Sequence, residues 1–433
     1  MMTDERTVNV NYVARVEGEG AVSVKIRDGS LEDLRLSIFE PPRFFEALLR
    51  GRSYEEAPDI TARICGICPV AYQMSSCHAM EKAVGVIMDD SLRDLRRLLY
   101  AGEWIESHVL HIYLLHLPDF TGHPDALTLA REQPSVVKKG LELKKAGNTL
   151  ISVLGGRSVH PVNVRVGGFY RVPAREELLS LRSMLEHALD IAAETVRFTA
   201  GLEFPSVEEN YEFVALTHPR EYPMNEGVIT STDGLHAPVE SFEAHFEEVQ
   251  VPYSNAYQVV RRGKGSYLTG PLARYALNHD RLTPEARDLS HEIGLKPVER
   301  NPNRSIVVRA LEVVLACEES LAIIDRYTPP DHPFIPPAHP VIPGSYAAIT
   351  EAPRGMLFHR YRLSSRGIIE DARIVAPTTQ NQRRIEDDLK HMVPRLLDFD
   401  DRRLADACER AIRNHDPCIS CATHFLDFRV ERS

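Results

Sequence analysis

Alternation of apolar and polar residues dominates the first 40 positions of the chain. Apolar side chains occupy every second position in 22–26 and again in 34–38, and Asp28-Gly29 lies between the two stretches. Successive side chains of a β-strand point to opposite faces, and Asp-Gly favours a tight turn. The pattern therefore predicts an antiparallel hairpin near the N-terminus.

From Glu46 onward, apolar residues recur at intervals of three and four, which is the period of an amphipathic helix. The longest such stretches predict helices over 91–117, 175–200 and about 305–327. Pro118 is expected to end the first of them.

Alternation returns at 355–375 and predicts another hairpin, whereas the proline-rich stretch 329–344 predicts an irregular connection. The predicted fold is α+β and predominantly helical, with small peripheral sheets near the N-terminus and around 355–375. No internal repeat or low-complexity segment divides the chain, so residues 1–433 are expected to form one intertwined domain.

Composition narrows the class of protein. The 433 residues are 43% hydrophobic and 26% charged, as in an ordinary globular protein, and 51 Lys and Arg stand against 62 Asp and Glu. A net charge of −11 argues against nucleic-acid binding. No run of 18 apolar residues predicts a membrane span, and the polar N-terminus does not resemble a signal peptide, so a cytoplasmic protein is expected. Seven cysteines in such a chain indicate metal or redox ligands rather than disulfides.

Two CxxC pairs stand near opposite ends, Cys65 with Cys68 and Cys418 with Cys421. Such a pair turns two thiolates toward one ion, and a nearby cation or a helix start favours the thiolate. Arg63 precedes the first pair, and Asp416-Pro417 is expected to open a helix before the second. Four sulfurs suit zinc, iron, nickel or an iron–sulfur cluster. A structural zinc site usually gathers its pairs within about 15 to 20 residues, whereas about 350 separate these, which favours a catalytic metal.

Eight segments together resemble the large subunit of nickel–iron hydrogenases. In chain order they are RVEGEG (15–20), FFEALLRGR (44–52), RICGICPVAYQMS (63–75), SHVLHIYLLHLPDF (107–120), GGRSVHPVNVRVGG (155–168), EAPRGMLFH (351–359), APTTQN (376–381) and HDPCISCATHF (415–425). The form of the third segment is most similar to the cytosolic NAD(P)-linked, sulfhydrogenase-like branch of that family.

The resemblance implies a nickel–iron centre that splits dihydrogen reversibly into protons and electrons. By position, Cys65 and Cys418 would be terminal ligands to nickel, and Cys68 and Cys421 would bridge nickel to an iron that carries carbon monoxide and cyanide. Cys418 would also accept the proton released from dihydrogen.

Further residues of the matching segments receive roles in the same way. Glu17 would carry the proton outward, although composition alone would make it a surface glutamate, as Glu19 is expected to be. Arg354 would lie over the metals, with a buried structural ion pair as the alternative, and Asp416 would either pair with it or cap the final turn. Thr378 would donate a hydrogen bond to a cyanide.

The resemblance also implies a magnesium ion near the centre. Glu46, His424 and the backbone carbonyl of Ile374 would be its ligands, with waters completing the shell. Tyr72 stands where many relatives have a histidine; it can donate a hydrogen bond to a sulfur but shuttles protons poorly near neutral pH. Cys77 keeps a possible role beside the centre.

No further cysteine motif, GxGxxG fingerprint or flavin signature is present, so electrons must leave through other polypeptides. The resemblance implies an iron–sulfur small subunit and, in this branch, flavin and iron–sulfur subunits that react with NAD(P). It also implies a maturation protease that removes residues 425–433 after His424. Two alternatives stay open at this point: a catalytically silent subunit related to the quinone-side subunit of respiratory complex I, and a zinc-stabilised interaction protein.

Overall fold

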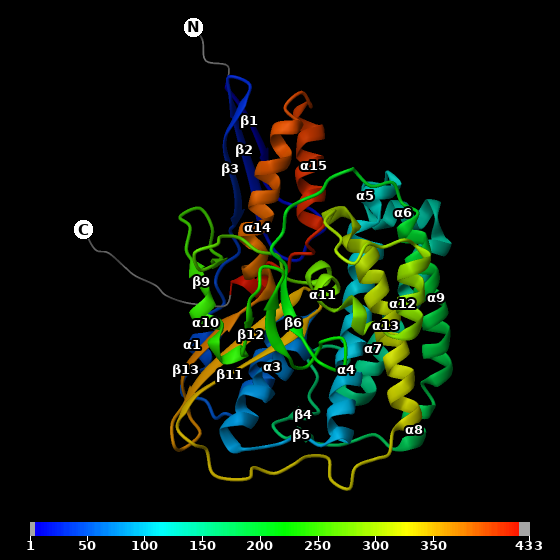
Figure 1. Cartoon of the computed structure of the whole chain (residues 1–433), viewed down its shortest axis with the longest axis vertical. Coiled ribbons are helices and arrows are strands. Elements are labelled where there is room, and N and C mark those ends of the chain that lie inside the picture. The colour runs from blue at the N-terminus through cyan, green and yellow to red at the C-terminus, as the bar shows by residue number, and fades with distance from the viewer. Residues whose placement is uncertain (1–4, 424–433) are drawn as a thin grey trace, which may run out of the picture.

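The N-terminal sheet forms as the alternation predicts. The computed structural model of the chain describes residues 5–423, and its first strands are β1 (Glu5–Val10), β2 (Gly20–Arg27) and β3 (Ser30–Ile38) in the order β1-β2-β3. Asp28 and Gly29 both have positive φ, 49° and 71°, which is the backbone of the tight hairpin turn. Helices α14 (Pro377–Met392) and α15 (Asp401–Arg413) cover this sheet at the top of Figure 1 and share an apolar core with it.

A helical bundle makes up the other side of the molecule (Figure 1). It contains α4 (Asp90–Val109), α7 (Pro134–Gly155), α9 (Arg182–Ala200), α12 (Pro284–Glu292) and α13 (Ser305–Arg326), each in contact with at least one other of them. Their apolar faces meet in the largest core of the described chain.

The structure corrects two helix boundaries. The stretch predicted as one helix over 175–200 is α8 (Arg175–Leu179) followed by α9, and the helix over 91–117 changes after Val109 into a π-helix, Leu110–His116. Pro118 does not end the helical path, since it is the first residue of α5 (Pro118–Thr121), where its missing N–H would be unpaired in any case.

The hairpin at 355–375 is confirmed and has a third strand. β11 (Gly344–Ala352), β12 (Gly355–Leu363) and β13 (Ile369–Val375) pair in that order, antiparallel throughout. Helix α3 (Pro69–Val84) packs on β11 and β12, and α1 (Phe45–Leu49) contacts β13. The proline-rich stretch forms no regular element before β11 begins.

Shorter elements connect these layers. They are α2 (Ala57–Thr61), α6 (Ala126–Glu132), β4 (Val164–Arg165), β5 (Gly168–Phe169), β6 (Val214–Thr217), β7 (Val228–Ser231), β8 (His236–Ala237), α10 (Phe242–His245), β9 (Phe246–Val249), β10 (Gln258–Arg261) and α11 (Pro271–Asn278). Within residues 5–423, no helix combines the length and apolar composition needed to cross a bilayer. The mainly helical α+β fold predicted from the sequence is thus confirmed.

Candidate metal centre

Four buried cysteine sulfurs meet where the two ends of the chain come together. Cys65 Sγ lies 3.0 Å from Cys68 Sγ and 3.6 Å from Cys418 Sγ, and Cys421 Sγ lies 2.8 Å from Cys418 Sγ and 3.9 Å from Cys68 Sγ. All four are free thiols. The four-sulfur group expected from the two CxxC pairs thus forms, and the fold brings residues about 350 positions apart to hydrogen-bond distance.

The first pair occupies the turn that leads into α3. Cys65 follows a short 3₁₀ turn, Ala62–Ile64, and Cys68 is the N-cap of α3. The backbone N–H groups of Ile67 and Cys68 donate to Cys65 Sγ at 3.3 and 3.1 Å. These donors orient the sulfur and favour its charged form.

The second pair lies in the segment that follows α15. Ile419 N–H donates to the carbonyl of Glu17 at 2.9 Å, so the segment lies beside the loop between β1 and β2. Gly18, at φ +89°, is required there, because a Cβ would lie 2.6 Å from the Ile419 side chain. The fold thus joins the N-terminal loop to the last cysteines.

Hydrogen bonds among the four thiols shift their pKa values in different directions. Burial opposes ionisation of Cys65, yet hydrogen bonds from the neighbouring thiols and the charge of Arg354 hold its pKa well below the usual value. Hydrogen bonding to Cys421 and the other thiols raises the pKa of Cys418. Four thiolates can therefore coexist here only when metal cations balance them.

Glu17 is the carboxylate nearest to the sulfurs. Its Oε2 lies 3.1 Å from Cys418 Sγ and accepts the Ser420 N–H at 3.1 Å. The side chain is partly exposed, so it lies between the buried sulfurs and the surface, while Glu19 is exposed. This placement suits a group that moves protons.

Arg354 approaches the sulfurs from the turn between β11 and β12. Its Nε donates to the Asp416 carbonyl at 2.8 Å, its Nη2 lies 3.1 Å from Asp416 Oδ1, and its Nη1 donates to Ser107 Oγ at 3.3 Å. Burial would lower the pKa of Arg354, but the charges of Asp416 and the sulfurs raise it well above the usual value. A fixed positive charge therefore borders the cluster.

Of the two roles expected for Asp416, the structure shows the ion pair with Arg354, and it corrects the helix start expected at Asp416 and the role expected for Arg63. Asp416 pairs with Arg354 and caps no helix: its φ is +50°, and the next turn, Ser420–Ala422, has no side-chain cap. Arg63 pairs with Asp59 at 3.0 Å instead of serving the first cysteine pair. The cation beside Cys65 is Arg354.

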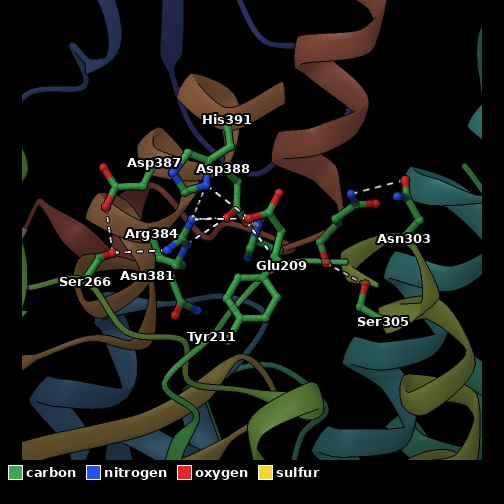
Figure 2. A network of polar contacts seen from close by, with 12 residues as sticks. Glu209, Tyr211, Ser266, Asn303, Ser305, Asn381, Arg384, Asp387, Asp388 and His391 are labelled. Carbon is green, nitrogen blue, oxygen red and sulfur yellow. Dashed lines mark hydrogen bonds and ion pairs between the residues drawn. The ribbon is translucent and has the colours of Figure 1, made fainter. Parts of the chain in front are cut away.

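Helix α14 holds the segment of the second pair through side-chain contacts. Cys418 N–H donates to Thr378 Oγ1 at 2.9 Å, at the start of that helix. Farther along it, Asp388 Oδ2 lies 2.9 Å from His415 Nε2, and Figure 2 shows Asp388 among Arg384, Tyr211 and Glu209. The cysteine segment is thus bonded to α14 at two points.

Tyr72 and Cys77 both lie on α3. Burial, then the charges of Cys421, Cys68 and Cys65, raise the pKa of Tyr72 well above its usual value, which keeps it a hydrogen-bond donor. Cys77 is fully buried outside the four-sulfur group, and burial raises its pKa to about 12.

Two of the three residues expected at a magnesium ion lie side by side. Ile374 N–H donates to Glu46 Oε1 at 2.7 Å, although the ligand expected from Ile374 is its carbonyl. Burial raises the pKa of Glu46 to about 8, although the Ile374 N–H and the charge of Arg373 act in the opposite direction. His424 lies outside the described residues.

Arg43 also belongs to this region, although no sequence pattern pointed to it. Its Nη2 donates to the carbonyls of Ile64, at 2.7 Å, and Ser420, and its N–H donates to the Thr423 carbonyl at 2.6 Å. It therefore joins the two cysteine segments. An arginine that binds the carbonyls of distant segments has no sequence motif, so its role appears only once the chain is folded.

Comparison with known proteins adds independent evidence. Residues 43–139 match the family model described as nickel-dependent hydrogenase. The chain is 32% identical to Sulfhydrogenase 1 subunit alpha of Pyrococcus furiosus, over 97% of this chain and 98% of that protein. Sulfhydrogenase 2 subunit alpha of the same organism is also 32% identical, over 97% and 99%.

The fold matches solved structures of equal extent. An NAD+-reducing [NiFe]-hydrogenase in the H2-reduced state superposes with a TM-score of 0.87 at 24% identity, over 97% of this chain and 99% of that one. A [NiFeSe]-hydrogenase of Dm. baculatum superposes with a TM-score of 0.79 at 20% identity, over 97% and 100%. With relatives this similar over almost their whole length, the chain belongs to the nickel-dependent hydrogenase family.

Proposed function

We propose that the chain is the catalytic large subunit of a nickel–iron hydrogenase in which dihydrogen is split reversibly into two protons and two electrons. Cys65 and Cys418 would hold nickel at its terminal positions, and Cys68 and Cys421 would bridge it to iron. When bound, this centre, with carbon monoxide and cyanide on its iron, supplies the site of dihydrogen cleavage. Four convergent buried thiols form a soft donor set that fits it.

The contact between Glu17 and Cys418 is the observation on which the proposal mainly rests. Cys418 Sγ would take the proton from dihydrogen, and Glu17 Oε2, 3.1 Å away, would receive it. Because Glu17 is partly exposed, it can pass the proton on toward solvent. A zinc site that only stabilises the fold has no use for a carboxylate at this distance.

Substitution of Glu17 by Gln tests this role. The amide keeps the shape of the side chain and can still accept the Ser420 N–H, but it cannot carry a proton. Para/ortho dihydrogen conversion, which needs no export of protons, should survive better in E17Q than hydrogen–deuterium exchange with solvent.

Glu19→Gln is the matched control, since Glu19 is exposed two residues away. It should leave both reactions unchanged. Equal loss of the two reactions in E17Q, or no loss, would contradict the relay.

The remaining polar residues would prepare the site. Arg354, held by Asp416, would place its charge over the metals, and Thr378 would turn its hydroxyl proton to a cyanide while its oxygen accepts the Cys418 N–H. Tyr72 would donate to a sulfur. Glu46, the Ile374 carbonyl and His424 would bind magnesium, and the contact between Glu46 and the Ile374 N–H supports a site shared by these two residues.

Electrons would leave through partner polypeptides. We propose an iron–sulfur small subunit, followed by flavin and iron–sulfur subunits that react with NAD(P), as the names of the relatives and of the NAD+-reducing structure suggest. A cytoplasmic location and one intertwined domain over residues 1–433 complete the proposal. A maturation protease would remove residues 425–433.

A further inference from the structure

The N-cap of helix α3 is a cysteine, and the acceptor for the first N–H groups of this helix comes from a distant part of the chain. An N-cap side chain normally accepts the N–H groups of the first turn, which have no partner within the helix. Cys68 makes no such bond, because its sulfur is turned toward Cys65 and Cys421. Pro69 has no N–H, so Val70 and Ala71 are the first donors of α3 that need an acceptor.

Glu103 supplies both acceptors from the middle of α4. Its Oε2 accepts the Val70 N–H at 2.6 Å, and its Oε1 accepts the Ala71 N–H at 3.1 Å. The residue is fully buried. Within residues 5–423 no Lys, Arg or His forms an ion pair with it, so its bonding is directed at the start of α3.

This arrangement suits a carboxylate for two reasons. Each oxygen takes one N–H, and the N-terminal end of a 16-residue helix attracts negative charge. Burial raises the pKa of Glu103 well above its usual value, whereas the N–H groups of Val70 and Ala71 lower it and so favour the charged form. The contacts with α3 therefore explain the position of Glu103. Helix α3 itself holds the turn that carries Cys65 and Cys68.

We propose that Glu103 is a positioning residue of the metal centre: it caps α3 in place of Cys68 and thereby leaves the Cys68 sulfur free for the metals. This inference rests on the proposed function for the metals, but the capping itself does not. If Glu103 were absent, two buried N–H groups would lack partners, and the first turn of α3 would open more often.

The test uses the complete purified enzyme and the variants E103Q and E103A. Amide hydrogen exchange at Val70 and Ala71 should become roughly tenfold faster or more in E103A, and E103Q should lie between E103A and the parent, since one oxygen remains. Nickel bound per chain should fall in the same order. If E103A cannot be purified, E103Q alone still shows the effect.

Asp89→Ala is the matched control, because Asp89 is exposed and caps the N-terminus of α4 by accepting the Leu92 N–H at 2.8 Å. In D89A, amide hydrogen exchange should become faster at Leu92 but not at Val70, and the nickel bound per chain should not change. Unchanged exchange at Val70 and Ala71 in both Glu103 variants would overturn the proposal. So would an E103Q enzyme with parental exchange and nickel that has lost hydrogen–deuterium exchange with solvent, because Glu103 would then carry protons. Fast exchange at α3 in an enzyme that holds zinc alone would uphold the cap and refute the hydrogenase centre.

Discussion

Cys418 has a set of contacts that Cys65, Cys68 and Cys421 lack. Its N–H is bound by Thr378 Oγ1, and its sulfur lies between Glu17 Oε2 and two other sulfurs. A thiolate at this point can hold a metal, accept a proton and then pass that proton to a carboxylate. Position within the fold, and not the identity of the residue alone, distinguishes the four cysteines.

Cys418→Ser should reduce dihydrogen turnover by about 10²–10⁴-fold, because a serine oxygen is a harder ligand and a weaker proton acceptor for this task. The measurement is turnover per bound nickel, with metal content determined on the same sample. Cys408→Ser is the control, since Cys408 is equally buried but packs between α15 and the N-terminal sheet. Near-normal turnover in a fully metallated C418S enzyme would show that the assignment is wrong.

A buried charge network behind the centre predicts a pH effect on stability. Arg274 binds Glu312 and Glu351 at 2.7 and 3.1 Å. Burial raises the pKa of Glu351 to about 7 from 4.5, even though Arg274 and the Leu216 N–H lower it. A carboxyl with a raised pKa stabilises the fold below pH 4.5 and loses that contribution as the pH rises toward 7.

Glu351→Gln removes this titration. The free energy of unfolding of the parent, relative to E351Q, should fall by up to about 3 kcal/mol between pH 4.5 and 7. Denaturant unfolding at a series of pH values measures it. Parallel curves for the two proteins would contradict the expected titration.

At the scale of elements, α14 is the support on which the last cysteine segment rests. Thr378 lies at its start, and Asp388, ten residues on, accepts from Tyr211 Oη at 2.8 Å and Arg384 Nε at 2.7 Å besides its contact with His415 (Figure 2). Burial alone would raise the pKa of Asp388, but the hydrogen bonds and charges of His415 and Arg384 lower it. The aspartate is therefore ionised and holds three donors at once.

Asp388→Asn should lower the free energy of unfolding by about 2–4 kcal/mol and reduce nickel binding, because the amide leaves one or more buried donors without an acceptor. The neighbouring Asp387 offers a matched control, since it binds Ser266 and Arg383 and is less buried than Asp388. Asp387→Asn should change neither quantity much. Denaturation midpoints and metal analysis of both variants measure the two quantities. Equal losses of stability and of bound nickel in the two variants would argue against a specific role for Asp388.

The elements that the sequence predicted are those stabilised by their own pattern. The hairpin at 20–38 and the helix Ser305–Arg326 follow from periodicity and from turn residues. The π-helix after Val109 and the left-handed Asp416 do not, because tertiary contacts select them over the local preference. The roles of Glu103 and Arg43 could not be predicted for the same reason. Each side chain binds backbone groups of a segment distant in sequence, and no spacing rule indicates such a contact.

At the scale of the whole molecule, the centre is assembled from both ends of the chain. The loop at Glu17, the turn before α3 and the segment after α15 meet there, and Arg43 bonds to the last two. Cys421, Ala422 and Thr423 are buried at the point where the described chain stops. Closure of the site therefore requires the C-terminal segment to be in contact with the Glu17 loop and with Arg43.

The sequence after His424 continues FLDFRVERS and carries Asp427, Arg429, Glu431 and Arg432. Burying four charges beside Thr423 would be costly unless each were paired, so these residues should hinder seating of the last turn while metals are loaded. We expect a protease to remove them after the metals are loaded. Intact-mass measurement of active enzyme should show a chain that lacks Phe425 to Ser433, and a chain made without those residues should bind less nickel. Full activity from a chain that keeps all nine residues would refute this sequence of events, whereas a mature end at another residue would move the cleavage point and leave the metal ligands as assigned.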